Sequence, residues 1–450
     1  MEVPLGFIAL VGLGVTVFIF APGYMSYDTT YQLQQALGRV PLSDWHPPVM
    51  SLLWRGLIDL TDGVSSMAIL QEAVFWASLW RISATVWRTA GHKGWAIGVY
   101  GLAALPFVLS FVGVVWKDVQ LAFALLAALA IALDLRASRQ RSALLRVALL
   151  FAGLLLLAYA TLVRKNAIFA VLPVLVLLGW SVWERGTVRR WVALAGAGIV
   201  VTWLPATLIT QLAHPRPTNQ VTQVMLDDLL HVMSPTELRK ADAPAALQHK
   251  LAAAAQTCAA KEVLMNTYWD CYGRGSQGNF TSVAYPGEIM RVWVSEIPKH
   301  LSEYLQYRTH LFARFLFWDR DFFQPGIQRN DLGVTVDRPL LQGAMQDYVL
   351  GWQRNLPWLF AGWFWLVLNV LLLARPGRGP NRVPVRLLGL SGSLYVLGYL
   401  PVVPQTDFRY LYWSVISGSV GSFLVLASRS HLGPMLERPA FQEVQPKPTE

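Results

Sequence analysis

The sequence has few charged residues for its length. Asp, Glu, Lys and Arg make up only 14% of its 450 residues, whereas 54% are hydrophobic. Soluble globular domains carry about 25% charged residues, so the composition excludes an ordinary water-soluble protein. Apolar runs such as LAFALLAALAIALDL and LLRVALLFAGLLLLAYATL approach the roughly 20 residues with which a helix crosses a bilayer. We therefore expect an all-α polytopic membrane protein.

Cysteine is also scarce. The chain contains 2 cysteines, Cys258 and Cys271, and both lie in the long, less apolar segment 213–355. Such a pair predicts a disulfide that closes a small loop in an oxidising compartment; two buried free thiols are the alternative. The segment also contains helix-like stretches such as SPTELRKADAPAALQHKLAAAAQ. We therefore expect it to form one mainly helical extracytoplasmic domain.

No Lys or Arg precedes the first apolar run, which makes it a poor secretory signal peptide and favours a retained first span. With the N-terminus inside, we expect about ten spans, at residues 3–21, 67–87, 94–112, 117–135, 144–162, 167–184, 191–212, 356–374, 385–402 and 409–427.

The basic loops then all face the cytoplasm, in a positive-inside pattern. They contain Arg88 and Lys93; Arg136, Arg139, Arg141 and Arg146; Arg185, Arg189 and Arg190; and Arg375, Arg378, Arg382 and Arg386. Topology thus accounts for the net charge of +10, and we expect no nucleic-acid partner.

The segment 48–60 is apolar but too short to be a span. It has about thirteen residues, against the roughly 20 that a crossing needs, and it contains Arg55 and Asp59. We interpret it as a helix at the interface, with Trp54 and Arg55 at headgroup level. The expected organisation is a membrane module (1–212) with a first outer loop (22–66), the outer domain (213–355), C-terminal spans (356–428) and a cytoplasmic tail (429–450).

Ionisable residues gather at the predicted outer face, in loops that are distant in the sequence. Charges just outside spans on a single face are candidate functional residues, because polar groups at membrane depth are costly. Each cation alone could simply extend to lipid headgroups, but several on the face that the positive-inside rule disfavours indicate an anionic ligand such as a lipid phosphate. The candidates are Asp28, Asp44, His46, Lys117, Asp118, Arg164, Lys165, Asp407 and Arg409, with the adjoining Tyr410.

Asp28 stands among tyrosines at the start of a predicted short helix. One interpretation is a helix N-cap, a position that Asp favours. The other is a general base that takes a proton from a hydroxyl nucleophile. His46 precedes two prolines that stiffen the backbone and aim its imidazole, although it could be a loop residue only. Asp28, Asp44 and His46 could also bind a divalent cation, but no tight ligand spacing supports a metal site.

The first outer loop resembles that of the GT-C glycosyltransferases. These multispan enzymes include protein O-mannosyltransferases and the lipid A aminoarabinose transferase. The resemblance lies in an aspartate shortly after the first span (Asp28), a helix with a Tyr…Ala…Gly stretch, the Pro-Pro that precedes an interfacial helix, and an acidic residue at the outer start of the fourth span (Asp118). The WKD and RKN motifs are most similar to bacterial members that modify O-antigen or other envelope glycans.

By that resemblance, Asp28 matches the catalytic base and Asp118 the second acidic residue. His46 stands where the aminoarabinose transferase has a lysine, and a neutral imidazole is a weaker partner for an anion. The resemblance implies a GT-C-like protein in the bacterial inner membrane, with both termini cytoplasmic and the active site on the periplasmic face.

The implied reaction is an inverting transfer of a sugar from a polyprenyl-phosphate donor to a hydroxyl of a glycan or lipid acceptor. Phosphate leaves well, so one base and cationic stabilisation suffice. Asp28 would deprotonate the acceptor, while Asp118 and Asp44 would orient sugar or acceptor. The donor phosphate would be held by Lys117, Arg164, Lys165 and Arg409. The resemblance assigns no cofactor, and a divalent cation stays an open alternative.

Two other functions fit a polytopic chain with charges at one face. A transporter or lipid flippase is the first, but no repeat pair or interrupted pair of spans is visible in the sequence. A noncatalytic assembly subunit, whose outer domain binds a partner, is the second.

Overall fold

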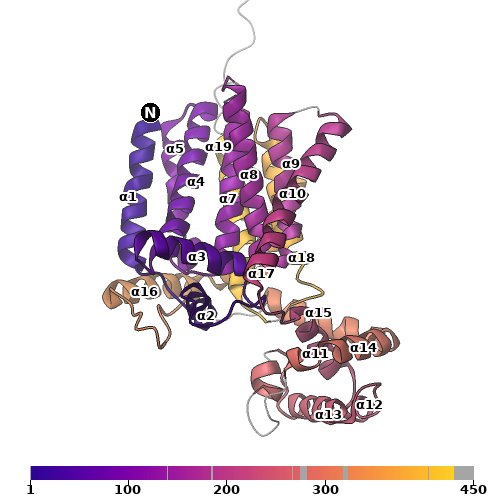
Figure 1. Ribbon diagram of the computed structural model, residues 1–450. Coiled ribbons are helices and arrows are strands. Elements are labelled where there is room, and N and C mark those ends of the chain that lie inside the picture. Colours follow the sequence, from indigo (N-terminus) through magenta and orange to yellow (C-terminus); the bar gives the residue numbers. More distant parts are fainter. Residues whose placement is uncertain are drawn as a thin grey trace, which may run out of the picture.

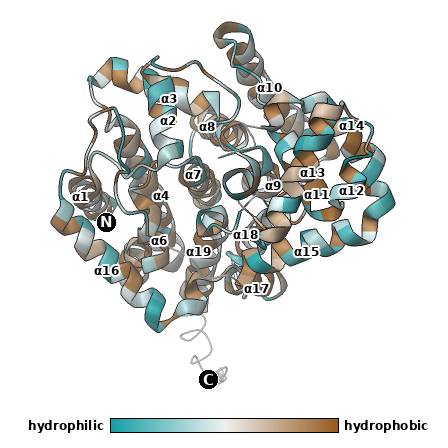
Figure 2. Ribbon diagram, turned by 90° about the horizontal axis from the view of Figure 1, so that it is seen from below, coloured by the Kyte–Doolittle hydropathy of each residue, from teal (hydrophilic) through white to brown (hydrophobic). Residues whose placement is uncertain are grey.

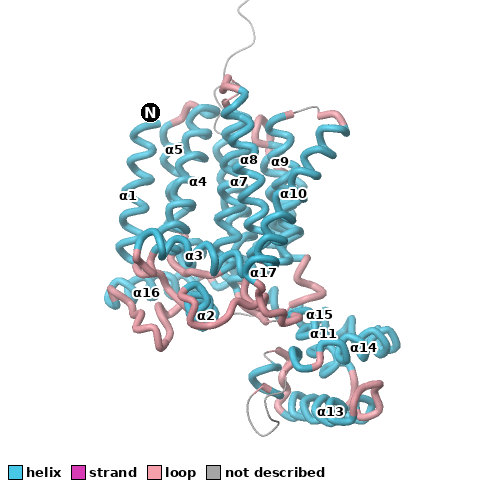
Figure 3. Tube along the Cα trace, viewed as in Figure 1, coloured by secondary structure: helices cyan, strands magenta, loops and turns pink. Residues whose placement is uncertain are grey.

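The computed structural model describes residues 2–138, 140–183, 186–265, 267–273, 281–317, 323–403 and 405–429. Within these ranges the chain consists of helices and loops, with isolated β-bridges in place of any strand (Figure 3). The expected all-α fold is confirmed for this part of the chain. Arg139, Arg185 and the expected tail from residue 430 onward lie outside the described residues.

Long helices run side by side and form a bundle (Figure 1). They are α1 (Glu2–Phe20), α4 (Ser66–Ala90), α7 (Lys117–Ala137), α8 (Ala143–Val163), α9 (Ile168–Val182), α10 (Val188–Ala213), α17 (Gly362–Ala374), α18 (Arg382–Leu397) and α19 (Tyr412–Arg429). We call the end at which α1 begins the upper end, and the opposite end the lower end, as in Figure 1.

In the described residues, 6 helices are long and apolar enough to cross a membrane, or 7 if one bent pair counts as a span. The expectation of about ten spans included three further helices of this bundle. The helix α4 carries Glu72 and Arg81 within its length. The helices α17 and α18 have only 13 and 16 residues, fewer than the roughly 20 of a straight crossing.

The helix α7 lies at the centre of the bundle. Seen from below, it stands among α4, α8, α9 and α19 (Figure 2), and it packs against all four. Its many alanines let the neighbouring backbones approach closely. The peripheral helix α10 instead exposes apolar side chains such as Ile199 and Trp203, as a lipid-facing helix does.

The segment 94–112 is not the straight span that we expected. It forms α5 (Lys93–Gly98), a 3-10 helix (Val99–Ala104) and α6 (Pro106–Val112), with a bend of 63° between the two halves. The bend falls at Leu105, whose backbone is extended. Proline disfavours the helical conformation of the residue before it, so Pro106 explains the break.

Two short helices, α2 (Tyr27–Ala36) and α3 (Pro48–Thr61), cover the lower end of the bundle (Figure 1). The helix α3 lies across this end, in agreement with the prediction that it does not span. The two residues expected at headgroup level make contacts within the protein. Trp54 is fully buried and donates to the carbonyl of Val64, while Arg55 donates to the last carbonyls of α2, at 2.8 and 2.9 Å.

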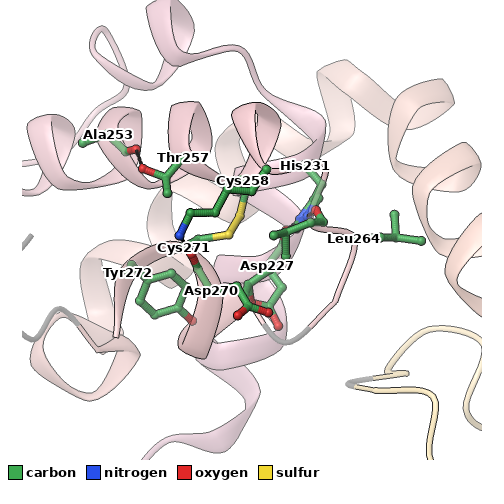
Figure 4. The surroundings of a disulfide bond; sticks show 12 residues. Asp227, His231, Ala253, Thr257, Cys258, Leu264, Asp270, Cys271 and Tyr272 are labelled. Carbon is green, nitrogen blue, oxygen red and sulfur yellow. Dashed lines mark hydrogen bonds between the residues drawn. A yellow bond between two sulfur atoms is a disulfide. The ribbon is translucent and has the colours of Figure 1, made fainter. Parts of the chain in front are cut away.

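The segment 213–355 divides into two parts. The helices α11 (Gln220–Val232), α12 (Pro235–Leu238), α13 (Ala245–Ala260), α14 (Pro286–Glu296) and α15 (Leu301–Phe317) gather below one side of the bundle, and we call them the outer cluster. The helix α16 (Pro339–Asn355) returns to the opposite side and packs against α1 and α6. The expected disulfide is confirmed: Cys258 of α13 is bonded to Cys271 (Figure 4).

A buried aspartate joins three arginines at the upper end. Asp134 is 1% exposed and forms ion pairs with Arg81, Arg88 and Arg141, the last two at 2.5 and 2.6 Å. These arginines come from α4 and from the loop after α7, so the cluster fastens the two helices together. Cationic charge is in excess here.

Candidate functional site

The segment that leads into α2 is held between two distant parts of the chain. Tyr24 exchanges backbone hydrogen bonds of 2.8 and 3.0 Å with residues 113–115, and Met25 does the same with residues 326–328. Gly23 makes the preceding turn with a φ of 106°, and a Cβ at this position would lie 2.8 Å from Ala68 and Val115. Only glycine tolerates both the positive φ and the close approach.

The start of α2 is fixed to the residues that precede α7. The indole of Trp116 donates to the hydroxyl of Ser26 over 2.8 Å, and the hydroxyl of Thr29 donates to the carbonyl of Val115 over 2.9 Å. Ser26 occupies the N-cap position, and Asp28 lies in the first helical turn. The N-cap interpretation of Asp28 is therefore wrong, and its carboxylate is used elsewhere.

Asp28 pairs with an arginine from the other end of the chain. An oxygen of its carboxylate lies 3.2 Å from Nη1 of Arg409, and Nε of the same guanidinium lies 2.8 Å from Asp407. The guanidinium also stacks on Trp116, 4.7 Å from the ring centroid. Arg409 thus joins two carboxylates and holds them at one face of Trp116.

The carboxylate of Asp28 is ionised. Burial acts to raise its pKa, but the charges of Arg409 and Lys117 outweigh burial and hold the pKa below its usual value. The side chain stays 40% exposed. Asp28 is therefore a charged and accessible hydrogen-bond acceptor.

A second carboxylate lies deeper, at the first turn of α7. Asp118 is 1% exposed and forms an ion pair with Arg164. Its other oxygen, Oδ2, has no hydrogen-bond partner among the described residues. The guanidinium of Arg164 lies 4.4 Å from the ring centroid of Tyr410, which in turn stacks on Tyr399. The predicted residues Asp118, Arg164 and Tyr410 thus form one buried unit.

The two lysines of the prediction differ in their surroundings. Lys117 precedes Asp118, is partly buried, and is close enough to Asp28 to lower the pKa of that carboxyl. It forms no ion pair with a described residue, whereas each neighbouring arginine does. Lys165 is exposed and makes no hydrogen bond or ion pair within the described ranges, so the structure does not bring it into the site.

Asp44 and His46 lie beside the site rather than in its centre. Asp44 accepts hydrogen bonds from the backbone and the hydroxyl of Thr218, and so connects the first loop to the chain before α11. The imidazole of His46 is buried, with its centroid 5.5 Å from that of Tyr31. Burial and the charge of Lys117 lower its pKa to about 4, so the imidazole is neutral.

A cavity of about 740 Å³ opens beside Asp28. Asp28, Asp407 and Arg409 form its polar part. Aromatic side chains make up much of the remaining lining: Phe111, Trp116, Trp269, Phe315, Phe323, Phe360 and Phe408. The charged residues of the cavity could be predicted from the sequence, since they adjoin apolar runs. Trp269 and the phenylalanines could not, because aromatic residues occur throughout this chain and their positions in the sequence do not mark a site.

The charges of the site are balanced. Lys117, Arg164 and Arg409 face Asp28, Asp118 and Asp407, while His46 is neutral. In the part of the chain that the structure describes, no group of three or more His, Cys, Asp or Glu side chains is arranged to hold a metal ion. The site therefore offers one accessible carboxylate, one unpaired ammonium and a large aromatic cavity.

No protein-family model, curated protein or solved structure matches this chain.

Proposed function

We propose that the protein is an inverting glycosyltransferase that moves a sugar from a polyprenyl-phosphate donor to a hydroxyl of a cell-envelope glycan or lipid. The observation that carries the proposal is the position of Asp28, an ionised and accessible carboxylate at the wall of an aromatic-lined cavity. Such a cavity suits a ligand with sugar rings and an isoprenoid chain, because aromatic faces pack on both.

Asp28 acts as the general base. It accepts the proton of the acceptor hydroxyl while the hydroxyl oxygen attacks the anomeric carbon; the bond from that carbon to the phosphate oxygen breaks, and the phosphate leaves with the electron pair. Arg409 orients the carboxylate through their contact of 3.2 Å. The attack occurs opposite the leaving group, so the anomeric configuration inverts.

Lys117 is the primary partner of the donor phosphate. Its ammonium has no ion-pair partner among the described residues, whereas Arg164 and Arg409 already bind carboxylates. We assign Arg164 to the positioning of Asp118, which orients the sugar from behind the cavity wall; its Oδ2 is buried and has no hydrogen-bond partner among the described residues.

The proposed setting is the bacterial inner membrane. The arginines at the upper end support a cytoplasmic position for that end and for both termini. The site, with α2 and α3, lies at the lower end, which would then be the periplasmic face. We keep about ten spans as part of the proposal. In this proposal the short helices α17 and α18 also cross the membrane, at a place where neighbouring helices and loops reduce the thickness that each helix must span.

The test is sugar transfer by purified protein in nanodiscs, with lipid-linked sugars from bacterial membranes as donors and envelope extract as acceptor. Asp28→Asn keeps the shape of the side chain and removes the base, so we expect transfer to fall about 10²- to 10⁴-fold. Asp62→Asn is the matched control, since Asp62 is an exposed aspartate of the same loop with a positive φ that Asn tolerates. Equal rates for the Asp28 variant and the wild type would refute the base assignment.

A transporter or flippase is the second candidate. The bend of 63° between residues 93–104 and α6 favours it, because broken helices mark the substrate paths of transporters. Proteoliposomes that translocate a fluorescent polyprenyl-phosphate sugar without transferring it would support transport over catalysis.

A further inference from the structure

Residues 267–272, which we call the strap, bring the outer cluster to the cavity. Trp269 of the strap lines the cavity together with Asp28 and Arg409, and its side chain is 53% exposed. Tyr272 of the same strap differs: it is 1% exposed and packs within the outer cluster. An accessible indole thus borders the space in which the base lies.

Side-chain contacts fix the strap to α11, α13 and the residue that follows α13; Figure 4 shows the surroundings of the disulfide among them. They are the contacts of Thr267 with Asp227, of Tyr272 with Gln223, of Lys261 with the carbonyl of Asp270, and the disulfide of Cys271 with Cys258. The disulfide is therefore two residues from Trp269. A ligand that stacks on Trp269 meets a ring whose backbone is already held, and little conformational freedom is lost on binding.

The strap also adjoins the segment that supplies Arg409. Met265, just before the strap, accepts a hydrogen bond from the hydroxyl of Thr406 at 3.2 Å, and Thr406 itself lines the cavity. Arg308 of α15 donates to the carbonyl of Val403 in the same segment. The outer cluster thus contacts the segment that leads to Asp407 and Arg409.

We propose that Trp269 is a carbohydrate-binding residue, on which a sugar ring of the acceptor glycan stacks. This inference rests on the proposed function. The indole presents a flat apolar face, the surface that the C–H face of a pyranose covers. We assign the ring to the acceptor because Trp269 comes from the outer cluster, which projects below the bundle, whereas the isoprenoid chain of a donor lies in the membrane and would enter from the side of the bundle.

The cavity has room for this arrangement. Its volume of about 740 Å³ exceeds what one sugar ring fills, and lies within the roughly 300–1,000 Å³ of small-molecule sites. One acceptor sugar can stack on Trp269 while the hydroxyl of the same or the next ring meets Asp28.

The experiment measures the binding of an array of bacterial envelope oligosaccharides to the full-length protein in nanodiscs, and in parallel the binding of undecaprenyl phosphate. We expect Trp269→Ala to weaken oligosaccharide binding about five- to tenfold and to leave the binding of undecaprenyl phosphate unchanged. Trp269→Phe, which keeps a ring, should retain part of the binding. Trp352→Ala, at an exposed tryptophan of α16, is the matched control.

The outcomes separate the two proposals. Equal oligosaccharide binding by wild type and Trp269→Ala, or no binding by either, would overturn the role of Trp269. Trp269-dependent oligosaccharide binding without any binding of undecaprenyl phosphate would support the role of Trp269 and count against the polyprenyl-phosphate donor. Reduction of the disulfide, verified by a mass shift after thiol labelling, should weaken oligosaccharide binding as Trp269→Ala does.

Discussion

The two ends of the bundle use the same chemical groups for different purposes. At the upper end, Asp134 is enclosed by three arginines, and all its contacts are within the protein. At the lower end, Asp28 shares a single arginine with Asp407 and stays 40% exposed beside a cavity. Carboxylate and guanidinium groups alone therefore do not indicate function; the accessibility of the carboxylate and the space beside it do.

Exchanging aspartate for asparagine at each end should give opposite results. Asp28→Asn should reduce transfer about 10²- to 10⁴-fold and lower the unfolding temperature only slightly, because the ion pair with Arg409 is partly exposed. Asp134→Asn should cost about 2–3 kcal/mol of stability, less than a fully buried ion pair, because the arginines can turn toward water. Thermal unfolding and transfer per folded molecule measure the two effects. An Asp134 variant that is stable but inactive would contradict the division between the ends.

Replacing the unpaired ammonium should affect donor binding. Lys117→Met should weaken the binding of undecaprenyl phosphate about 10- to 100-fold, since hydrogen bonds to charged groups contribute about 1.5–3 kcal/mol. Lys165→Met is the matched control, because Lys165 is exposed and outside the site. Titration of the lipid phosphate in nanodiscs gives both affinities. If the Lys165 variant loses more affinity than the Lys117 variant, the assignment of the phosphate partner is wrong.

His46 should make stability depend on pH. Its pKa is lowered from 6.5 to about 4 in the fold, so the unfolded chain binds more protons between these values. The contribution of the neutral imidazole is complete above pH 6.5 and is lost as the pH falls toward 4; it is on the order of 3 kcal/mol. The contribution of His46 is measured by comparing the unfolding temperatures of wild type and His46→Gln from pH 8 down to pH 4. Parallel curves for both proteins would contradict it.

The smallest effect is expected at Asp44. Asp44→Asn retains an acceptor for Thr218 and should cost only about 1 kcal/mol of stability, without a change in the affinity for undecaprenyl phosphate. The measurement is the unfolding temperature together with lipid phosphate titration. If the Asp44 variant is stable but no longer binds the lipid, Asp44 belongs to the binding site, as the sequence predicted.

Much of the fold follows from local patterns. The apolar runs and the positions of arginine predicted the bundle helices, and the length of 48–60 predicted that α3 does not span. The bend at Leu105 was not predicted, although the proline that causes it is visible in the sequence. The division of 213–355 could not be predicted, because it depends on which surface α16 covers.

The site could be predicted only as a set of residues. Charges that adjoin spans pointed to Asp28, Asp118, Arg164 and Arg409, which the structure brings together. Their pairing could not be predicted, because it depends on the distance between chain segments. Lys165 lies one residue from Arg164 yet stays outside, since a short 3-10 helix directs the two side chains apart.

The two-sided attachment of the segment before α2 determines when the site can form during synthesis. Met25 bonds to residues 326–328, and Asp28 bonds to Arg409. Nearly the whole chain must therefore emerge and insert before Met25 and Asp28 both have their distant contacts. A nascent or prematurely terminated chain that contains all helices through α10 still lacks both partners, and therefore has no assembled site.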